Sequence, residues 1–408
     1  MRIWKKCCAM MLALCLMLTA GAALAEALEA VEEVTVPVLA EMKKFTIPEN
    51  EAMTLVRELR MGWNLGNTFE AFDGYTRHAK GTDMESSWVG VKTSEGVIDA
   101  LKEAGFIAMR LPVSWHNHVD ENDRIDADWL ARVREVAGWA LDRGLYVIVN
   151  VHHDNNERFF YPDSAHYERS AAYLTAIWRQ MAEAFADCDD HLILESMNEP
   201  RLVDTAYEWS WDKNAPACQD AADCVNRLNQ LFVDIVRATG GNNATRYLSI
   251  PAYDAAPWNA ADEAFQLPKD SVDNRIIVAA HAYTPYNFAL NLQSSDNTFD
   301  LDSEPSKKAE IAGFLNSLYE RFVANGIPVL MDEFGAMEKD GNLQARVNFT
   351  AYYVAAASAR GITCFWWDNH LFRGNGERFG ILNRRTCEWV YPEIVEAMRT
   401  YSLYHRDE

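Results

Sequence analysis

The sequence lacks the patterns that build zinc centres, nucleotide sites and membrane spans. It has no Cys-x-x-Cys pair and no Cys/His cluster with zinc-ligand spacing. No Gly-x-Gly-x-x-Gly or phosphate-binding loop follows the first strand-like run. Beyond the N-terminus, no segment is apolar over the roughly 20 residues that span a bilayer. These absences argue against a zinc protein, a dinucleotide-binding enzyme and an integral membrane protein.

Positive charge is also scarce, with 38 Lys and Arg against 60 Asp and Glu. Residues 1–25 have the features of a secretory signal peptide: a basic start, the apolar stretch Ala9–Leu18 and the cleavage motif Ala23-Leu24-Ala25. We therefore expect export and a mature chain that begins near Glu26, with a net charge of −25. Such a surface repels nucleic acid and anionic membranes, so we expect the protein to bind neither. We also expect a monomer.

Few cysteines remain after the signal peptide, namely Cys188, Cys218, Cys224, Cys364 and Cys387. Because their number is odd, at least one is unpaired. Cys218 and Cys224 are close enough in the sequence to close a short disulfide loop in an oxidising compartment. The sequence leaves open whether they do.

The remaining chain has the pattern of one large domain. Residues 26–50 are acidic and poorly patterned, as expected of a leader or linker, and no repeat or second linker follows within 51–408. Short apolar runs then alternate with segments of helical period, which indicates βα units and a parallel sheet. The expected strands are 61–65, 107–111, 146–151, 192–196, 247–250, 276–280, 328–331 and 363–367. The expected helices are 94–104, 128–143, 170–186, 222–239, 307–325 and 343–360.

Eight such strands predict a single-domain (β/α)8 barrel, or TIM barrel. A doubly wound open sheet would give a similar alternation, but the glycine-rich loop typical of its first βα turn is missing. Active sites of these barrels lie at the C-terminal ends of the strands. Two expected strands lead into acidic side chains at that end: Glu199 follows Leu192–Ser196, and Glu333 follows Pro328–Met331.

Two carboxyl groups at one barrel mouth suit glycosidic bond hydrolysis, in which one protonates the leaving oxygen and the other attacks carbon or activates water. A carboxylate just past a strand can equally be a helix cap or a solvated loop residue, so the other strand ends decide. Polar and aromatic side chains gather at nearly all of them. They form the motifs Gly-Trp-Asn-Leu-Gly-Asn (62–67), Arg-Leu-Pro-Val-Ser-Trp (110–115), Val-His-His (151–153), Asn-Glu-Pro (198–200), His-Ala-Tyr (281–283), Asp-Glu-Phe-Gly (332–335) and Trp-Trp-Asp-Asn (366–369).

In this order the motifs resemble glycoside hydrolase family 5, and especially its bacterial and rumen endoglucanase branch, from about Leu59 to Leu382. The resemblance implies that Glu199 is the acid/base and Glu333 the nucleophile of a retaining mechanism. Arg110 is the candidate cation that keeps Glu333 ionised. It could instead be an interior arginine that neutralises Glu195, and both contacts could coexist.

The resemblance also implies sugar-binding and supporting residues. Asn198 suits the sugar 2-hydroxyl, although it could be a plain strand-end turn residue. His281 and Tyr283 are expected beside the nucleophile, with Tyr283 donating to it. His152 and His153 are adjacent and so point to opposite faces of a strand, which argues against a metal site. We expect His152 to bind sugar hydroxyls.

Aromatic rings line sugar clefts because they stack on the apolar faces of glucose. Trp367 is the expected platform, with Trp366 facing the helices. The further expected contacts are Asn67, Glu70 and His118. Looser aromatic candidates are Trp63, Trp88, Trp115, Trp209, Trp211 and Trp258. His370 stands where the branch usually has Gly, which affects the expected shape of the cleft and not the chemistry.

The sequence therefore predicts a secreted endo-β-1,4-glucanase that cuts cellulose-type and mixed-linkage β-glucans by double displacement, without cofactor or metal. The same machinery could instead act mainly on xyloglucan, xylan or mannan, because specificity lies in the loops. A barrel that only binds polysaccharide is the alternative outside enzymes. Such proteins usually lack one of the two glutamates, and this chain has both.

Overall fold

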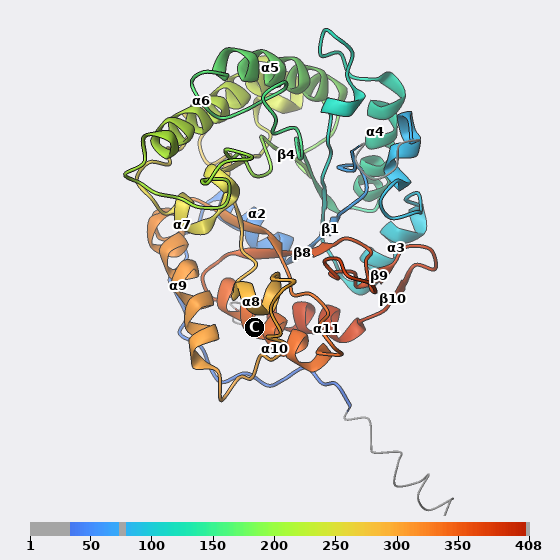
Figure 1. Cartoon of the computed structure of the whole chain (residues 1–408), viewed down its shortest axis with the longest axis vertical. Helices are drawn as coiled ribbons and strands as arrows, with labels where there is room; N and C mark the ends of the chain where they lie inside the picture. Colours follow the sequence, from blue (N-terminus) through green and yellow to red (C-terminus); the bar gives the residue numbers. More distant parts are fainter. Residues whose placement is uncertain (1–32, 73–78, 405–408) are drawn as a thin grey trace, which may run out of the picture. The chain divides into compact units, whose positions relative to one another are not determined.

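The structure, a computed structural model, describes residues 33–72 and 79–404. The expected signal peptide and the first part of the expected leader lie outside these residues. Val36–Glu408 forms one compact unit, in which eight parallel strands close into a barrel inside a ring of helices (Figure 1). The prediction of a (β/α)8 barrel is confirmed.

The barrel strands occur where the apolar runs predict them. They are β1 (Met61–Leu65), β2 (Ala108–Leu111), β3 (Tyr146–Asn150), β4 (Leu192–Glu195), β5 (Leu248–Pro251), β6 (Ile276–His281), β7 (Val329–Phe334) and β8 (Thr363–Asp368). Each strand pairs with the next, and β8 returns to β1 with Asn64 opposite Trp367. Parallel strands covered on both faces read as continuous apolar runs, which is why the sequence shows them clearly.

The six expected helices are all present, and the described residues contain four further α-helices. The expected ones are α3 (Glu95–Ala104), α4 (Ala127–Asp142), α5 (Tyr167–Ala184), α6 (Pro216–Ala238), α9 (Pro305–Arg321) and α10 (Leu343–Ser358). The additional ones are α2 (Glu51–Leu59), α7 (Pro257–Ala260), α8 (Tyr286–Ala289) and α11 (Pro392–Tyr401). A small hairpin, β9 (Leu382–Asn383) with β10 (Glu388–Trp389), follows the barrel.

Helix α6 corrects one expectation, because it begins at Pro216 and not at Ala222. Proline suits the first turn of a helix, where its missing N–H costs nothing. Cys218 and Cys224 therefore lie six residues apart on one helix, about 9 Å along its axis. Disulfides need Cα atoms within about 7 Å, so a disulfide between them is excluded, and both cysteines are free and buried.

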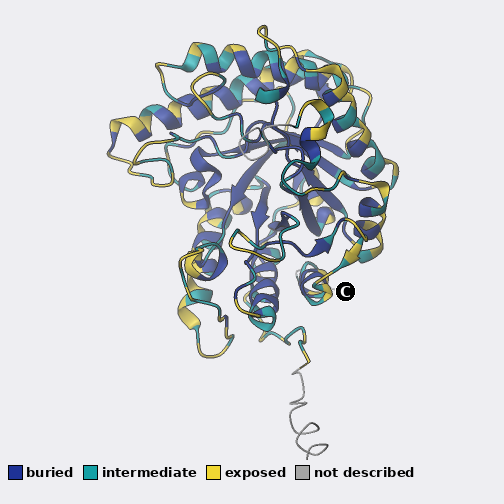
Figure 2. Cartoon of the chain, turned by 45° about the vertical axis from the view of Figure 1, so that its right-hand side comes forward, coloured by how far each residue is buried: buried dark blue, intermediate teal, exposed yellow. Residues whose placement is uncertain are grey.

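An apolar plug closes the N-terminal end of the barrel. Helix α2 starts at the cap residue Asn50, whose side chain accepts from the Met53 N–H at 2.9 Å. Its face of Ala52, Leu55, Val56 and Leu59 packs on one side chain from each of several strands, among them Ile148 and Phe365. Figure 2 shows the strands buried and exposure confined to the outer faces of the helices and the loops. Polar chemistry is thus left to the opposite, C-terminal mouth.

The segment before α2 has no regular secondary structure but contacts the C-terminal part of the fold. The Leu39 N–H donates to the Tyr401 hydroxyl at 3.0 Å, and the Phe45 N–H donates to the Ala359 carbonyl at 3.3 Å. Gly361, which follows α10 with a left-handed φ of 75°, leaves room for Ile47, because a Cβ there would lie 2.7 Å from that side chain. None of the helices in the described ranges combines the length and apolarity needed to cross a membrane.

Candidate active site

The strand ends at the C-terminal mouth converge on one buried cation, Arg110 of β2. Its Nε and Nη2 each donate to a Glu195 carboxylate oxygen at 2.7 Å, and its Nη1 donates to Glu333 at 2.6 Å. Nη2 also donates to Asn198 at 2.7 Å, and Nη1 to Asn64 at 3.0 Å. The two roles considered for Arg110, beside Glu333 and beside Glu195, therefore occur together.

Glu333 lies at the end of β7, and its residue is only 5% exposed. Besides Arg110, the Tyr283 hydroxyl donates to it at 2.9 Å, and Nδ1 of His281 lies 3.7 Å from it. Burial raises the pKa of Glu333, while the charges of His281 and Arg110 act in the opposite direction. Hydrogen-bond donors thus hold this carboxylate in one orientation at the mouth.

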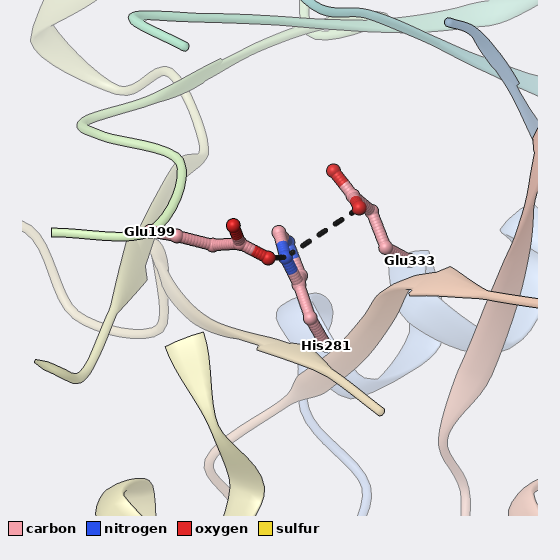
Figure 3. A group of neighbouring side chains, drawn as sticks. All are labelled: Glu199, His281 and Glu333. Atoms are coloured by element: carbon pink, nitrogen blue, oxygen red, sulfur yellow. Dashed lines mark hydrogen bonds and ion pairs between the residues drawn. The ribbon is translucent and has the colours of Figure 1, made fainter. Parts of the chain in front are cut away.

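Glu199, just past β4, faces the same space (Figure 3). His281 Nδ1 is 2.8 Å from one Glu199 oxygen, and Arg201 Nη1 is 3.7 Å from the other. One oxygen each of Glu199 and Glu333 lie within 4.8 Å of one another. Burial alone would raise the pKa of Glu199, but the hydrogen bond and charge of His281, with Arg201, lower the pKa to about 2.

His281 lies between the two carboxylates (Figure 3), and its charge acts to lower the pKa of each. Burial would lower the pKa of His281, but the charges of Glu333 and Asp332 outweigh it and raise the pKa well above 6.5. Its Nε2 lies 3.4 Å from Asp332, which contacts Arg110 as well. In the free site the imidazole of His281 therefore holds a proton beside the ionised Glu199.

Glu199, His281 and Glu333 are also the one set of three potential metal ligands in the described ranges. Their chemistry does not suit a divalent cation. His281 is held protonated by its carboxylate neighbours, and a protonated imidazole cannot ligate. The Arg110 guanidinium also lies 2.6 Å from Glu333 and would repel a metal ion.

One wall of the mouth is formed by Trp367 of β8. Its ring is stacked on His152 with centroids 5.8 Å apart, and it packs with Met337 and Phe379. Trp366 points the other way, toward Arg346 of α10, as the alternation along a strand predicts. His153 contacts the rings of Phe72 and Trp88. A flat ring thus lies beside the carboxylate pair.

His152 is neutral and held in place. Its Nδ1 is 3.1 Å from the Asn150 amide, which also donates to Glu195 at 3.0 Å. Burial lowers the pKa of His152 well below 6.5, and neighbouring His153 and Arg110 add to this effect. A neutral imidazole can both donate to and accept from a hydroxyl group.

Two of the expected contact residues, Glu70 and His118, also contact the scaffold. The Glu70 carboxylate accepts from the Thr68 N–H at 2.8 Å and from the Asn67 N–H, so it stabilises the turn after β1. His118, in the short helix His116–His118, is stacked on Trp129 of α4 with centroids 3.6 Å apart. Glu70 thus stabilises its own turn and His118 packs on α4, and the expectation that they bind sugar stays a prediction.

Several residues at the mouth were not selected from the sequence. Asn64, Asn150 and Asp332 hold Arg110, His152 and His281, and each lies inside or beside a quoted motif. Arg201 directly follows Asn-Glu-Pro and pairs with Glu199. Asp254, after β5, carries no motif, yet burial and the charge of Glu199 raise its pKa to about 8.

His370 adopts a left-handed backbone with φ 58°, which explains why glycine suits this position. Its N–H donates to Asp368 at 2.8 Å, and its ring contacts the carbonyl of Leu382. The side chain thus closes a turn beyond Trp367. The expectation that this departure affects the shape of the cleft stays a prediction.

Known proteins share the sequence pattern and the fold. The cellulase family, glycosyl hydrolase family 5, matches residues 72–372. Endoglucanase 1 of Ruminococcus albus is 39% identical over 374 residues, which cover 91% of this chain and 86% of that protein. A family 5 lichenase from Caldicellulosiruptor sp. F32 has 48% identity and a TM-score of 0.88, over 91% of this chain and all of the other.

A further solved relative is the broad-specificity endoglucanase from Ruminococcus champanellensis, determined with bound cellotriose. It is 40% identical, with a TM-score of 0.78 over 87% of this chain and 99% of the other. The expected family and enzyme class are both confirmed by these matches. The chain belongs to the cellulase branch of glycosyl hydrolase family 5 and is an endo-1,4-β-glucanase.

Proposed function

We propose that this endoglucanase retains anomeric configuration, with Glu333 as the nucleophile and Glu199 as the acid/base. The supporting observation is the short gap between them, since one oxygen of each lies within 4.8 Å of the other. Retaining enzymes place their carboxyl groups about 5–5.5 Å apart, whereas inverting enzymes need about 6.5–9.5 Å to admit a water molecule.

Glu333 is the better nucleophile because its donors hold it as an oriented anion. Arg110 and Tyr283 bind different oxygens of the carboxylate, at 2.6 and 2.9 Å. Arg110 also binds the carbonyl oxygen of the Asn198 amide. The amide nitrogen of Asn198 is then oriented to donate to the sugar 2-hydroxyl, and Trp367 offers its ring to the sugar face.

The acid role requires a proton on Glu199, which the free site holds on His281. A state with Glu199 ionised and His281 protonated contains the same number of protons as one with Glu199 protonated and His281 neutral. The two groups are joined by a single 2.8 Å hydrogen bond. Substrate that excludes water from Glu199 favours its neutral form, and the proton then moves along that bond without uptake from solvent.

The substrates are soluble β-1,4-glucans and mixed-linkage β-glucans, and the enzyme is exported as a monomer. The likeness to a lichenase and to broad-specificity endoglucanases supports this range. Rates on barley glucan, xyloglucan, xylan and mannan test it. Barley glucan should be cleaved fastest, and faster cleavage of mannan would contradict the proposal.

Product stereochemistry and chemical rescue test the mechanism. NMR of freshly formed product should show the β-anomer first, whereas an initial α-anomer would refute double displacement. In Glu333→Ala, azide should restore turnover of an activated aryl cellobioside and give an α-glycosyl azide. Glu199→Ala should instead keep a fast first step on that substrate, whose leaving group needs no protonation. Glu320→Ala, on the exposed face of α9, is the control and should behave as wild type.

A further inference from the structure

An exposed tryptophan, Trp209, is connected to Glu199 through one arginine that contacts both. Trp209, in the loop between β4 and α6, is 60% exposed, although tryptophan is usually largely buried. Its ring packs on the guanidinium of Arg201, whose Cζ is 4.0 Å from the ring centroid. The same guanidinium lies 3.7 Å from the Glu199 carboxylate. Arg201 thus joins the indole to the acid.

Arg201 is fixed by contacts other than Trp209. Its backbone N–H donates to the Asn155 side chain at 2.8 Å, and its Nη1 donates to the Glu199 carbonyl at 3.0 Å. Its Nε contacts Glu208 at 3.4 Å. A cation held in this way gives the indole a fixed support on one face. The exposure of Trp209 shows that its other face is open.

The position of Trp209 identifies what this open face would meet. The acid protonates the oxygen of the leaving group, so the sugars beyond Glu199 belong to the part of the chain that departs. Trp367 lies on β8, next to β7 and its Glu333, while Trp209 follows β4 and its acid. The two rings therefore belong to opposite sides of the bond that is cut.

Exposed aromatic rings gather on this side of the barrel. In the described ranges, the exposed large aromatic side chains are Trp209, Trp258 and Tyr286. They follow the neighbouring strands β4, β5 and β6: Trp209 lies in a loop, Trp258 in the short helix α7 and Tyr286 in the short helix α8. Uncharged rings exposed at an otherwise acidic surface suit a neutral, ring-shaped ligand.

We propose that the open face of Trp209 binds the leaving-group sugars of the β-glucan chain, as a stacking platform held by Arg201. The proposal rests on the function proposed above, because it takes Glu199 as the acid. It assigns Trp209 to binding of the departing chain and gives it no part in the bond-breaking chemistry itself.

The test compares two substrates that differ on the leaving-group side. Cellohexaose carries sugars there, whereas 2,4-dinitrophenyl β-cellobioside carries none. Trp209→Ala should lower kcat/KM on cellohexaose at least about tenfold, since a few aromatic side chains carry most of the energy of such contacts. It should leave kcat/KM on the aryl cellobioside unchanged. Trp209→Phe, which keeps a ring, should restore most of the loss.

A second arginine–tryptophan pair provides the matched control. Arg132 lies over Trp139 at 4.9 Å on α4, outside the mouth, so Trp139→Ala should leave both rates unchanged. An equal fall on both substrates in Trp209→Ala would reveal a structural role and overturn the proposal, as would no fall on cellohexaose. Failure of the underlying mechanism would appear separately, as an initial α-anomer from the wild-type enzyme.

Discussion

Replacing Arg110 by methionine should damage both the fold and the nucleophile, because one buried cation serves both. The guanidinium is fully buried and contacts three carboxylates, those of Glu195, Asp332 and Glu333. Breaking a buried ion pair by removing one partner costs about 3–5 kcal/mol, since the remaining charge is left uncompensated. We therefore expect the free energy of unfolding of Arg110→Met to fall by at least this amount.

The effect on activity has a definite sign. The charge of Arg110 lowers the pKa of Glu333, against the effect of burial. Without Arg110 that pKa rises, and the nucleophile is ionised only at higher pH. The acidic limb of the kcat/KM profile should therefore move toward higher pH, in addition to a fall in the maximum.

Urea unfolding and pH–rate profiles of three variants separate these effects. Adding Glu195→Gln to Arg110→Met should recover part of the lost stability, because it removes one uncompensated buried charge. Arg346→Met, which removes a buried arginine that donates to the carbonyl of Ala336, should lower stability without moving the acidic limb. Arg110→Met with wild-type stability and an unmoved acidic limb would refute the reasoning.

Three further predictions concern the scaffold and processing. Burial holds the pKa of His118 at about 4, so the folded state loses stability as pH falls from 6.5 toward 4; His118→Phe should remove about 3 kcal/mol of this loss in unfolding titrations. An unchanged pH dependence would contradict it. Cys218 and Cys224 should resist alkylation in the native protein and both react after unfolding, whereas a cross-linked peptide would contradict their free state. The exported protein should begin at or near Glu26 by intact mass, and retention of residues 1–25 would contradict the expected processing.

The barrel can be predicted from the sequence because its strands and helix ends are marked by short patterns of neighbouring residues. Apolar runs define the strands, and glycines such as Gly105 and Gly326 mark the helix ends with left-handed φ. Helix α2 is not evident from the sequence because it is only nine residues long and its apolar face forms a plug only against the assembled strands. The start of α6 at Pro216 is not evident from the sequence because Gln219, Asp220 and Asp223 interrupt the apolar pattern of its first turns.

At the mouth, residue types could be predicted but their partners could not. The motifs select Glu199, Glu333 and Arg110, yet the ion pair of Arg201 with Glu199 depends on how the loop after β4 folds back. Glu70 has the residue type of a sugar ligand, but its carboxylate is used by the backbone of its own turn. The proton on His281 follows from the approach of three carboxylates, which no local pattern records.

Trapping the covalent intermediate tests the central claim most directly. The wild-type enzyme, treated with 2,4-dinitrophenyl 2-deoxy-2-fluoro-β-cellobioside, should lose activity and gain the mass of one fluorinated cellobiosyl group. Peptide mass spectrometry should place that group on Glu333, because its oriented carboxylate lies across the mouth from the acid. A label on Glu199, or inactivation without any covalent label, would contradict double displacement through Glu333.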